Sequence, residues 1–454
     1  MASMLFNANS ACRRSPMASS AIVASALLVA CAVFAPATAR AQSSAQATSR
    51  ILMEHVSPPG DSTHSSAVLY PSEYSASRRW PVLFVLDPRG RAMPSLERFA
   101  DAADRLGYVV ISSYDSRSDS SKDVNVRAIN AMLATAFSRV AVDTTRMYLA
   151  GFSGTARQMW DFAAELPTNI AGVIGFGAGL PNMGDGFAAA FEGRQAFAYF
   201  AGAGEEDFNF IETKVFAEKV KGTVAARFAE YAGPHAWPSA AICGAALEWM
   251  HSRAILGGRI AVDSAFVLGR IRAELDSARA LERSGQLAKA AAAFQRTADD
   301  YAGWPGTREA KERGAALSAS PAVHEYVAWS ATLADAEQRQ ELELERALVV
   351  ARLHSMTTQQ LLEGLEIEPL MQRAASRDSL QAPTARRLLA RVQVALAFYE
   401  PRDHLARGNG RDALELLAAA NRISPLMGES CAMLARARTL APRVHPELRC
   451  ATTN

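Results

Sequence analysis

One serine in this sequence has surroundings that suit a nucleophile. Ser153 lies in the stretch 148–157, where an apolar run breaks at Gly151 and a helical pattern begins after the serine. This pattern is typical of a nucleophile elbow, a tight turn from a buried strand into a helix that exposes the serine hydroxyl. Gly151 and Gly154 would let strand and helix approach closely. Thr155 is a departure, because the usual G-x-S-x-G pattern has its last glycine there.

An acidic loop follows the serine and precedes a histidine. Serine, acid and histidine follow one another in this chain order in hydrolases that use a nucleophile elbow. The apolar segment 196–201 runs into a loop that carries Glu205, Glu206 and Asp207. Any of these carboxylates could hold an imidazole in the right tautomer and stabilise its charge. The order matters, because a serine between small residues before a helix is more often only a turn or a helix cap.

The candidate base is His235. It follows the alternating segment 226–231, so it lies where a loop leaves a strand. His251 is the only other histidine between Ser153 and residue 255, and it lies inside a helical pattern, where we expect it at the surface. A serine hydroxyl becomes a good nucleophile when a neighbouring imidazole takes its proton, so Ser153 and His235 are expected to meet.

Three motifs together resemble the α/β-hydrolase family, within it the secreted esterases, polyester depolymerases and dienelactone-hydrolase-like enzymes. They are the segments 151–155, 204–207 and 233–238, and the resemblance covers about residues 50–255, a little under half of the chain. It implies hydrolysis of a small or polymeric carboxylic ester through an acyl-enzyme, with neither metal nor cofactor. It also favours Asp207 as the acid, because Asp207 closes a Gly-x-x-Asp loop similar to that of the family.

Two other functions stay open. One is a binding protein in which the hydrolase-like half is a scaffold and the helical half does the work. The other is a serine peptidase similar to the prolyl-oligopeptidase catalytic domain, although the β-propeller expected with that domain has no counterpart in this sequence. A complete set of serine, acid and histidine favours the hydrolase, because a scaffold has no need of all three.

The resemblance also implies an oxyanion hole built from two backbone N–H groups. The residue after the serine, Gly154, would supply one of them. The loop after the apolar run 80–86 would supply the other, and since Pro88 has no N–H, Arg89 is the candidate. The side chains of Arg89 and Arg91 fit a solvated turn.

The elements that must position these residues alternate between strand and helix. We expect strands at 51–55, 67–70, 80–86, 108–111, 146–149, 171–177, 196–201 and 226–231, and helices at 95–106, 124–140 and 240–251. Continuous apolar runs are typical of strands buried on both faces of a parallel sheet. The sequence therefore predicts the α/β class, with a doubly wound, mostly parallel sheet.

Residues 1–41 are expected to be a signal peptide. An arginine pair precedes the apolar run 21–35, and a small-x-small cleavage site ends at Ala41. Residues 42–50 fit a flexible tether. The protein is therefore expected to be exported, to the periplasm or beyond. A lipobox that ends at Cys31 is the alternative, and a retained anchor is disfavoured because the apolar run is shorter than the ~20 residues that span a bilayer.

Size and charge bound the rest. About 410 residues would remain after cleavage, more than one core usually holds, so we expect a catalytic domain at 51–255 and an all-α domain at 256–454. The formal charge of the whole chain is +2, and because the signal segment holds three arginines and no acid, the mature chain carries −1. This balance gives no support for a nucleic-acid partner.

Three cysteines would remain after cleavage. In an oxidising compartment we expect a bridge between Cys431 and Cys450, with Cys243 buried in the helix that follows His235. None of the three has the spacing of metal ligands.

The second half of the chain has helical periodicity and two similar segments. Each has a glycine, Gly285 or Gly408, followed at fixed offsets by small or apolar residues, which resembles a tetratricopeptide repeat. The two glycines are 123 residues apart, no multiple of the usual period of about 34, so a degenerate array is expected. Ordinary helical hairpins are the alternative. Because every site candidate precedes Arg253, this half is expected to bind a partner or a large substrate, not to complete the site.

Overall fold

The computed structural model describes residues 50–118, 120–166, 170–180, 191, 193, 197–378 and 381–451. The predicted signal peptide, with its cleavage site and Cys31, lies outside these residues, as does nearly all of the predicted tether. The described residues belong to one compact unit, Thr48–Asn454. Among them, no helix has both the length and the apolar character that a membrane span requires.

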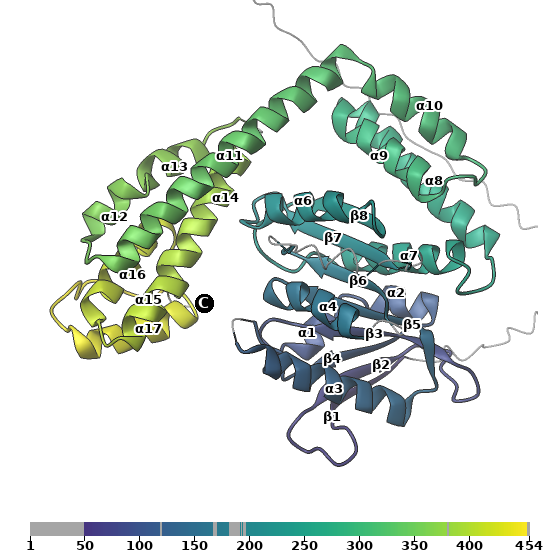
Figure 1. Cartoon of the computed structure of the whole chain (residues 1–454), viewed down its shortest axis with the longest axis horizontal. Coiled ribbons are helices and arrows are strands. Elements are labelled where there is room, and N and C mark those ends of the chain that lie inside the picture. Colours follow the sequence, from purple (N-terminus) through teal and green to yellow (C-terminus); the bar gives the residue numbers. More distant parts are fainter. Residues whose placement is uncertain are drawn as a thin grey trace, which may run out of the picture. The chain divides into compact units, whose positions relative to one another are not determined.

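Eight strands form one sheet in the order β1-β2-β4-β3-β5-β6-β7-β8 (Figure 1). They are β1 (Ile51–Val56), β2 (Ser66–Tyr70), β3 (Trp80–Leu86), β4 (Val109–Ser113), β5 (Val142–Phe152), β6 (Ile170–Phe176), β7 (Ala198–Gly204) and β8 (Ala225–Tyr231). The strands from β4 to β8 along this order run parallel, whereas β1 and β2 are antiparallel to their neighbours. The sheet is thus of the mixed, mostly parallel α/β-hydrolase type, which confirms the predicted fold class.

Helices cover both faces of this sheet (Figure 1). One face packs against α3 (Lys122–Arg139), α4 (Gly154–Glu165) and α6 (Phe210–Val220). The other face packs against α1 (Ala92–Glu97), α2 (Ala100–Leu106) and α7 (Ala240–Leu256). Successive side chains of β3 alternate between the two cores, as the pleat of a strand requires. This double burial explains why β3 reads as a continuous apolar run.

The helix expected over 95–106 is broken in two. A turn at 98–99 separates α1 from α2. Phe99 lies in that turn and is fully buried in the same core as Leu96 and Ala103. The change of direction therefore allows both short helices to pack on the sheet, a tertiary preference that helical periodicity does not report.

The strand order reverses beside β3, since β4 lies on one side of it and β5 on the other. In open parallel sheets, ligands bind at such a reversal, outside the carboxyl ends of the strands. Asp87 follows β3 there and Ser153 follows β5. Asp207 and His235 follow β7 and β8 at the same edge of the sheet. The topology alone therefore gathers all the candidate residues on one edge.

The rest of the described chain is helical. The helices are α8 (Ser264–Arg283), α9 (Leu287–Asp300), α10 (Thr307–Ser318), α11 (Pro321–Leu353), α12 (Thr358–Gly364), α13 (Ile367–Ala374), α14 (Gln381–Val394), a π-helical turn (Ala395–Tyr399), α15 (Glu400–Ala406), α16 (Gly410–Ile423) and α17 (Glu429–Leu440). We call these elements the helical region, and the chain up to Leu256 the sheet region. The boundary predicted at 255 falls one residue before the end of α7, and the division into two domains stays a prediction.

The helical region has two apolar cores. One joins α8, α9 and α10, and it includes Ile255 from α7. The other joins the second half of α11 to the helices that follow it. Gly285 and Gly408 both lie in helix turns with left-handed backbone, at φ 76° in each case. The shared pattern thus marks helical hairpins, and their tetratricopeptide character stays a prediction.

A disulfide joins Cys431 and Cys450, whose Cα atoms are 5.8 Å apart. The bridge ties the C-terminal segment to α17. Cys243 is free and buried in α7, where burial raises the pKa of its thiol to about 12. A thiol with so high a pKa is inert at neutral pH. The expected bridge between Cys431 and Cys450 and the expected burial of Cys243 are both confirmed.

Candidate active site

Ser153 lies on a sharp turn between β5 and α4. Its φ is 56°, a left-handed value that is uncommon for a residue with a side chain. Gly151 permits the turn, because a Cβ atom there would lie 2.8 Å from the backbone nitrogen of Ala156. Such strained backbone occurs often at functional sites, where the surrounding structure holds it in place. The segment therefore has the conformation of the predicted nucleophile elbow.

Thr155 takes the place of the usual glycine because its hydroxyl ties the elbow together. The hydroxyl accepts the N–H of Phe152 at 3.1 Å, and it lies 2.7 Å from the carbonyl oxygen of Leu86 and 2.8 Å from that of Phe152. The side chain is completely buried. Since Leu86 ends β3, the threonine joins the serine turn to the neighbouring strand, a link that glycine could not make.

Ser153, His235 and Asp207 are connected by hydrogen bonds. The Nε2 atom of His235 is 2.9 Å from Ser153 Oγ, and its Nδ1 atom is 2.8 Å from Asp207 Oδ1. If Nδ1 carries the proton and donates it to the carboxylate, Nε2 is free to accept the serine proton. Asp207 is fully buried, whereas the side chain of His235 is 19% exposed. The structure thus brings together the three side chains that the sequence singled out.

The ring of His235 lies between two phenylalanine rings. Phe152 and Phe208 have ring centroids 4.6 Å and 4.2 Å from that of the histidine. Gly177, after β6, leaves room beside it, because a Cβ atom there would lie 3.2 Å from His235 and 3.1 Å from Asp207 Oδ2. Gly177 has a φ of 65°, which also favours glycine. Neither Phe208 nor Gly177 is among the site residues predicted from the sequence. The only sequence feature that pointed toward Gly177 is the strand predicted at 171–177, which indicates a strand end at this edge of the sheet.

The competing acids are turned away from His235. Glu205 pairs with Lys289 at 3.1 Å, and Glu206 pairs with Arg386 at 2.8 Å. Asp207 is held inward instead, since its Oδ1 atom also accepts the N–H of Asn209 at 2.8 Å. The geometry therefore favours Asp207 over both glutamates.

His251 lies inside α7, as expected, and it is half-buried, not fully exposed. Its ring contacts Tyr108 of the sheet region and Phe266 of α8, with centroid distances of 5.9 and 4.9 Å. Burial lowers the pKa of His251 to about 4. Helical spacing showed which face of α7 carries the residue, but not that α8 covers this face. His251 packs between two regions and takes no part in the candidate site.

The loop that carries His235 is fixed by three contacts. Trp237 donates its indole N–H to Asp87 Oδ2 at 2.8 Å, and Tyr231 donates its hydroxyl to the carbonyl of Ala236 at 3.0 Å. Arg98 donates to the carbonyl of Pro238 at 2.7 Å. The partners of the loop follow β3 (Asp87), end β8 (Tyr231) and follow α1 (Arg98), so the loop is held by several parts of the sheet region.

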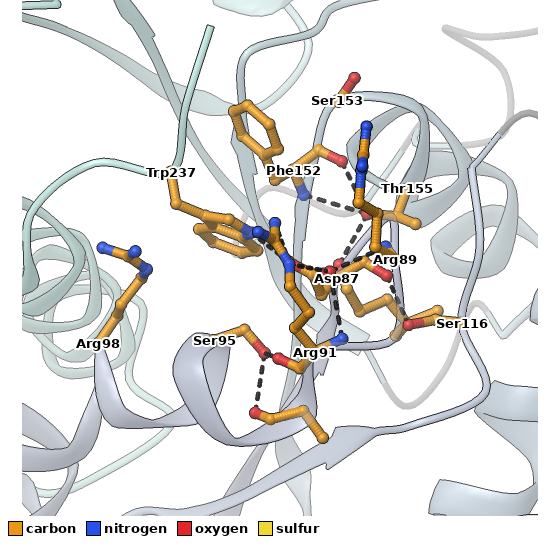
Figure 2. Close-up of polar contacts among 12 residues, drawn as sticks. Asp87, Arg89, Arg91, Ser95, Arg98, Ser116, Phe152, Ser153, Thr155 and Trp237 are labelled. Carbon is orange, nitrogen blue, oxygen red and sulfur yellow. Dashed lines mark hydrogen bonds and ion pairs between the residues drawn. The ribbon is translucent and has the colours of Figure 1, made fainter. Parts of the chain in front are cut away.

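Asp87 is the centre of the polar contacts after β3 (Figure 2). Its buried carboxylate accepts the backbone N–H of Arg89 at 2.8 Å, the side chain of Arg91 at 3.0 Å, and the indole of Trp237. Burial alone would raise the pKa of Asp87, but hydrogen bonds from Arg91, Arg89 and Trp237 hold it below its usual value. Asp87 thus joins the loop after β3 to the loop that carries His235.

This arrangement corrects the predicted oxyanion hole. Gly154 is the first residue of α4, where a backbone N–H has no acceptor within the helix, as the prediction required. The N–H of Arg89, by contrast, is bound to Asp87 and is not free to hold an oxyanion in this structure. Pro88 has no N–H, which pointed to Arg89, but the side chain of Asp87 folds back onto its own loop and takes up the Arg89 N–H.

The described residues offer no metal site, since no three histidine, cysteine or acidic side chains among them are grouped to hold an ion. A cavity of about 610 Å³ borders the acidic loop on the side of the helical region. Its lining includes Glu205, Phe210 and Arg387, but not Ser153. It is therefore not the place where an ester would meet the serine.

Three solved structures illustrate what this chain is similar to. A ferulic acid esterase matches 44% of this chain and 94% of its own, with 14% identity and a TM-score of 0.35. An S-formylglutathione hydrolase from Agrobacterium tumefaciens matches 45% of this chain and 95% of its own, with 14% identity and a TM-score of 0.36. FphF, a fluorophosphonate-binding serine hydrolase of Staphylococcus aureus, matches 44% and 98%, with 14% identity and a TM-score of 0.34.

No protein-family model matches the sequence, and no curated protein matches it. Identities and TM-scores as low as those of the three solved structures say nothing about activity, which has to be argued from the site itself.

Proposed function

We propose that this protein is a serine hydrolase that cleaves a carboxylic ester through an acyl-enzyme. The observation that carries the proposal is the hydrogen-bonded line Ser153, His235 and Asp207, with contacts of 2.9 and 2.8 Å. A serine and an imidazole at this distance, with a buried carboxylate behind the imidazole, suit nucleophilic catalysis. The strained turn at Ser153 supports the same assignment.

The reaction would proceed in two halves. Ser153 Oγ attacks the acyl carbon while His235 Nε2 takes the hydroxyl proton, and Asp207 stabilises the imidazolium. The Gly154 N–H, at the positive end of α4, binds the oxyanion. The ester C–O bond then breaks, and His235 returns the proton to the departing alcohol. In the second half, a water molecule gives a proton to His235 and attacks the acyl carbon. The bond from the acyl carbon to Ser153 Oγ then breaks, His235 returns the proton to Oγ, and the acid is released.

The test is covalent labelling of the full chain by a fluorophosphonate, together with hydrolysis of a short-chain p-nitrophenyl ester. Both signals should be lost in Ser153→Ala and kept in Ser277→Ala, which removes an exposed hydroxyl from α8. His235→Ala should remove nearly all turnover, and we expect it to keep the native circular dichroism spectrum. Labelling that persists in Ser153→Ala would contradict the assignment of the nucleophile.

The same assay separates the competing functions. A wild-type protein that neither labels nor hydrolyses the ester would favour a binding protein on a hydrolase scaffold. Faster cleavage of a peptide amide than of the ester would favour a peptidase. We propose the esterase because a hydrogen-bonded triad supports chemistry, and a scaffold has no use for it.

We further propose that the protein is exported. The Cys431–Cys450 disulfide supports this, because such bridges persist in oxidising compartments. The arginine pair and apolar run at the N-terminus support it as well. The N-terminal sequence of protein recovered outside the cytoplasm should begin at Gln42. A lipidated chain that begins at Cys31 would replace this proposal by the lipid-anchored alternative.

A further inference from the structure

The loop between β7 and α6 carries Asp207. Its inner edge faces the loop of His235 and its outer edge faces the helical region, so different parts of the chain hold its two edges. We call residues 205–209 the acid loop. On its inner edge, the N–H of Glu205 donates to the carbonyl of Tyr231 at 2.8 Å, and the N–H of Glu206 donates to that of Gly233 at 3.0 Å. These bonds tie the acid loop to the loop of His235. Its outer edge faces α14 of the helical region.

Two arginines of α14 bind that outer edge. Arg387 donates to the carbonyl oxygen of Glu205 at 2.7 Å, and Arg391 donates to that of Phe208 at 2.9 Å. Asp207 lies between these two carbonyls in the chain. The ring of Phe208 also contacts that of His235, with centroids 4.2 Å apart and the planes tilted by 36°. The two hydrogen bonds therefore lie on either side of Asp207 in the chain, and one of them holds Phe208, whose ring contacts His235.

The arginines are themselves fixed by acids of α11. Arg387 binds the buried Glu337 through two hydrogen bonds of 2.6 and 2.5 Å, and Arg391 pairs with Glu341. The arginines are four residues apart on α14 and the glutamates four apart on α11, so each pair lies on one face of its helix. Each guanidinium thus joins a carboxylate of α11 to a carbonyl of the acid loop, which suits its rigid fork of donors.

The contact between α14 and the acid loop lies beside the cavity of about 610 Å³, which is lined by Glu205, Arg387 and Thr384 among others. The side chains of Arg387 and Arg391 are only 11% and 21% exposed, so their hydrogen bonds are largely shielded from water. Loss of one arginine would leave a loop carbonyl with water or with no partner.

We propose that Arg387 and Arg391 are positioning residues that hold Asp207 against His235, so that the helical region completes the active site. This inference rests on the proposed hydrolase function. It replaces the expectation that residues up to Arg253 suffice for activity, since both arginines come from a helix more than 100 residues further along the chain. A displacement of about 1 Å in a catalytic constellation can lower turnover by 10²-fold, so a contact that does not touch the substrate can control the rate.

The test uses Arg387→Ala, Arg391→Ala and the double variant in the full chain, with two readouts. The first is hydrogen exchange of the backbone amides at 205–210, which should become faster in each variant. The second is ester hydrolysis, in which kcat should fall about 10- to 100-fold while KM stays within about twofold. The control is Arg422→Ala, which removes an exposed ion pair from α16 and should change neither readout.

Conservative variants distinguish positioning from general stabilisation. Arg391→Lys keeps the charge and N–H donors but lacks the rigid planar fork, and should recover part of the kcat lost in Arg391→Ala, whereas Arg391→Gln should recover less. Unchanged exchange at 205–210 in both alanine variants would overturn the proposal, as would faster exchange with unchanged kcat. If the wild-type protein hydrolyses no ester, the proposed function fails, and the exchange data alone decide whether α14 holds the acid loop.

Discussion

The serine side and the acid side of the candidate site are held by different regions of the molecule. Around Ser153, the contacts come from the sheet region, where Gly151 permits the turn and Thr155 binds the end of β3. Around Asp207, the helical region adds the arginines of α14. A serine-side contact spans few residues or neighbouring strands, whereas the acid-side contact joins residues about 180 apart. The contacts of the serine turn are thus local, whereas the acid loop also binds a distant part of the chain.

The largest expected effect tests whether Asp207 is the acid that orients His235 during catalysis. Asp207→Asn should lower kcat by about 10⁴-fold, by analogy with the triad aspartate of other serine hydrolases, because the amide favours the wrong tautomer of His235. Glu205→Gln and Glu206→Gln should each change kcat by only a few-fold, because both glutamates bind surface cations. Steady-state hydrolysis of a chromogenic ester measures all three. A loss in Glu206→Gln equal to that in Asp207→Asn would move the acid to position 206.

A second contact between the regions should affect stability without a selective effect on turnover. Arg227 of β8 binds Glu274 of α8 at 2.8 Å and lies 3.3 Å from Asp300, and the three side chains are at most 14% exposed. Arg227→Ala removes the nearest cation from two buried carboxylates, while Arg270 stays 3.5 Å from Glu274, and the change should cost up to about 3–5 kcal/mol of unfolding free energy. Urea unfolding measures this cost.

The matched control for this contact is Arg279→Ala, which removes an exposed pair with Glu309 and should cost at most about 1 kcal/mol. The kcat of folded Arg227→Ala should stay close to that of the wild type, because the network lies away from the acid loop. A large fall in kcat at unchanged KM would show that a contact far from the acid loop also controls turnover. That result would contradict a specific positioning role for α14.

The same comparison explains what the sequence could predict. The elbow, the strands and the loop of His235 have short-range signals, namely apolar runs, glycines and chain order, and these placed Ser153, Asp207 and His235 correctly beside one another. The misses are of two kinds. At Arg89 the miss is local, since the N–H is taken up by Asp87 only two residues earlier, as in an Asx turn. At α14 the miss is a contact between distant segments, and nothing near Arg387 or Arg391 shows that this helix meets the acid loop.

The helical periodicity predicted where helices form, but not which surfaces they pack against. It predicted helices throughout the second half of the chain, but the surface that each helix covers depends on tertiary packing. His251 is an example, since its place in α7 was predicted correctly while its cover by Phe266 was not. The acid loop likewise offers three carboxylates, and tertiary contacts separate them. Glu205 pairs with Lys289 and Glu206 with Arg386, whereas Asp207 binds His235.

A smaller effect is expected on the serine side. Thr155→Val keeps the shape of the side chain but removes the hydroxyl that accepts the N–H of Phe152 and binds the end of β3. An unsatisfied buried donor costs about 1–3 kcal/mol, and the looser turn at Ser153 should also lower kcat. Thr155→Ser keeps the hydroxyl and should retain most of both. Thermal unfolding and ester hydrolysis measure the pair, and equal losses in the two variants would show that the methyl group matters more than the hydrogen bonds.

The smallest expected effect concerns His251, which packs between the sheet region and α8. Its pKa is about 4 in the folded protein, whereas the ordinary value is about 6.5, so the unfolded chain binds more protons between these values. Stability should therefore fall as the pH drops from about 6.5 to 4, and His251 should account for about 2 kcal/mol of this loss. His251→Gln removes the titrating group, so the difference in unfolding free energy between pH 7 and pH 4.5 should shrink by this amount. His324→Gln, which changes an exposed histidine of α11, should leave the difference unchanged. If both variants retain the full acid sensitivity, the contact of His251 with Phe266 does not exclude water, and the junction between the two regions at α7 is looser than the ring contacts indicate.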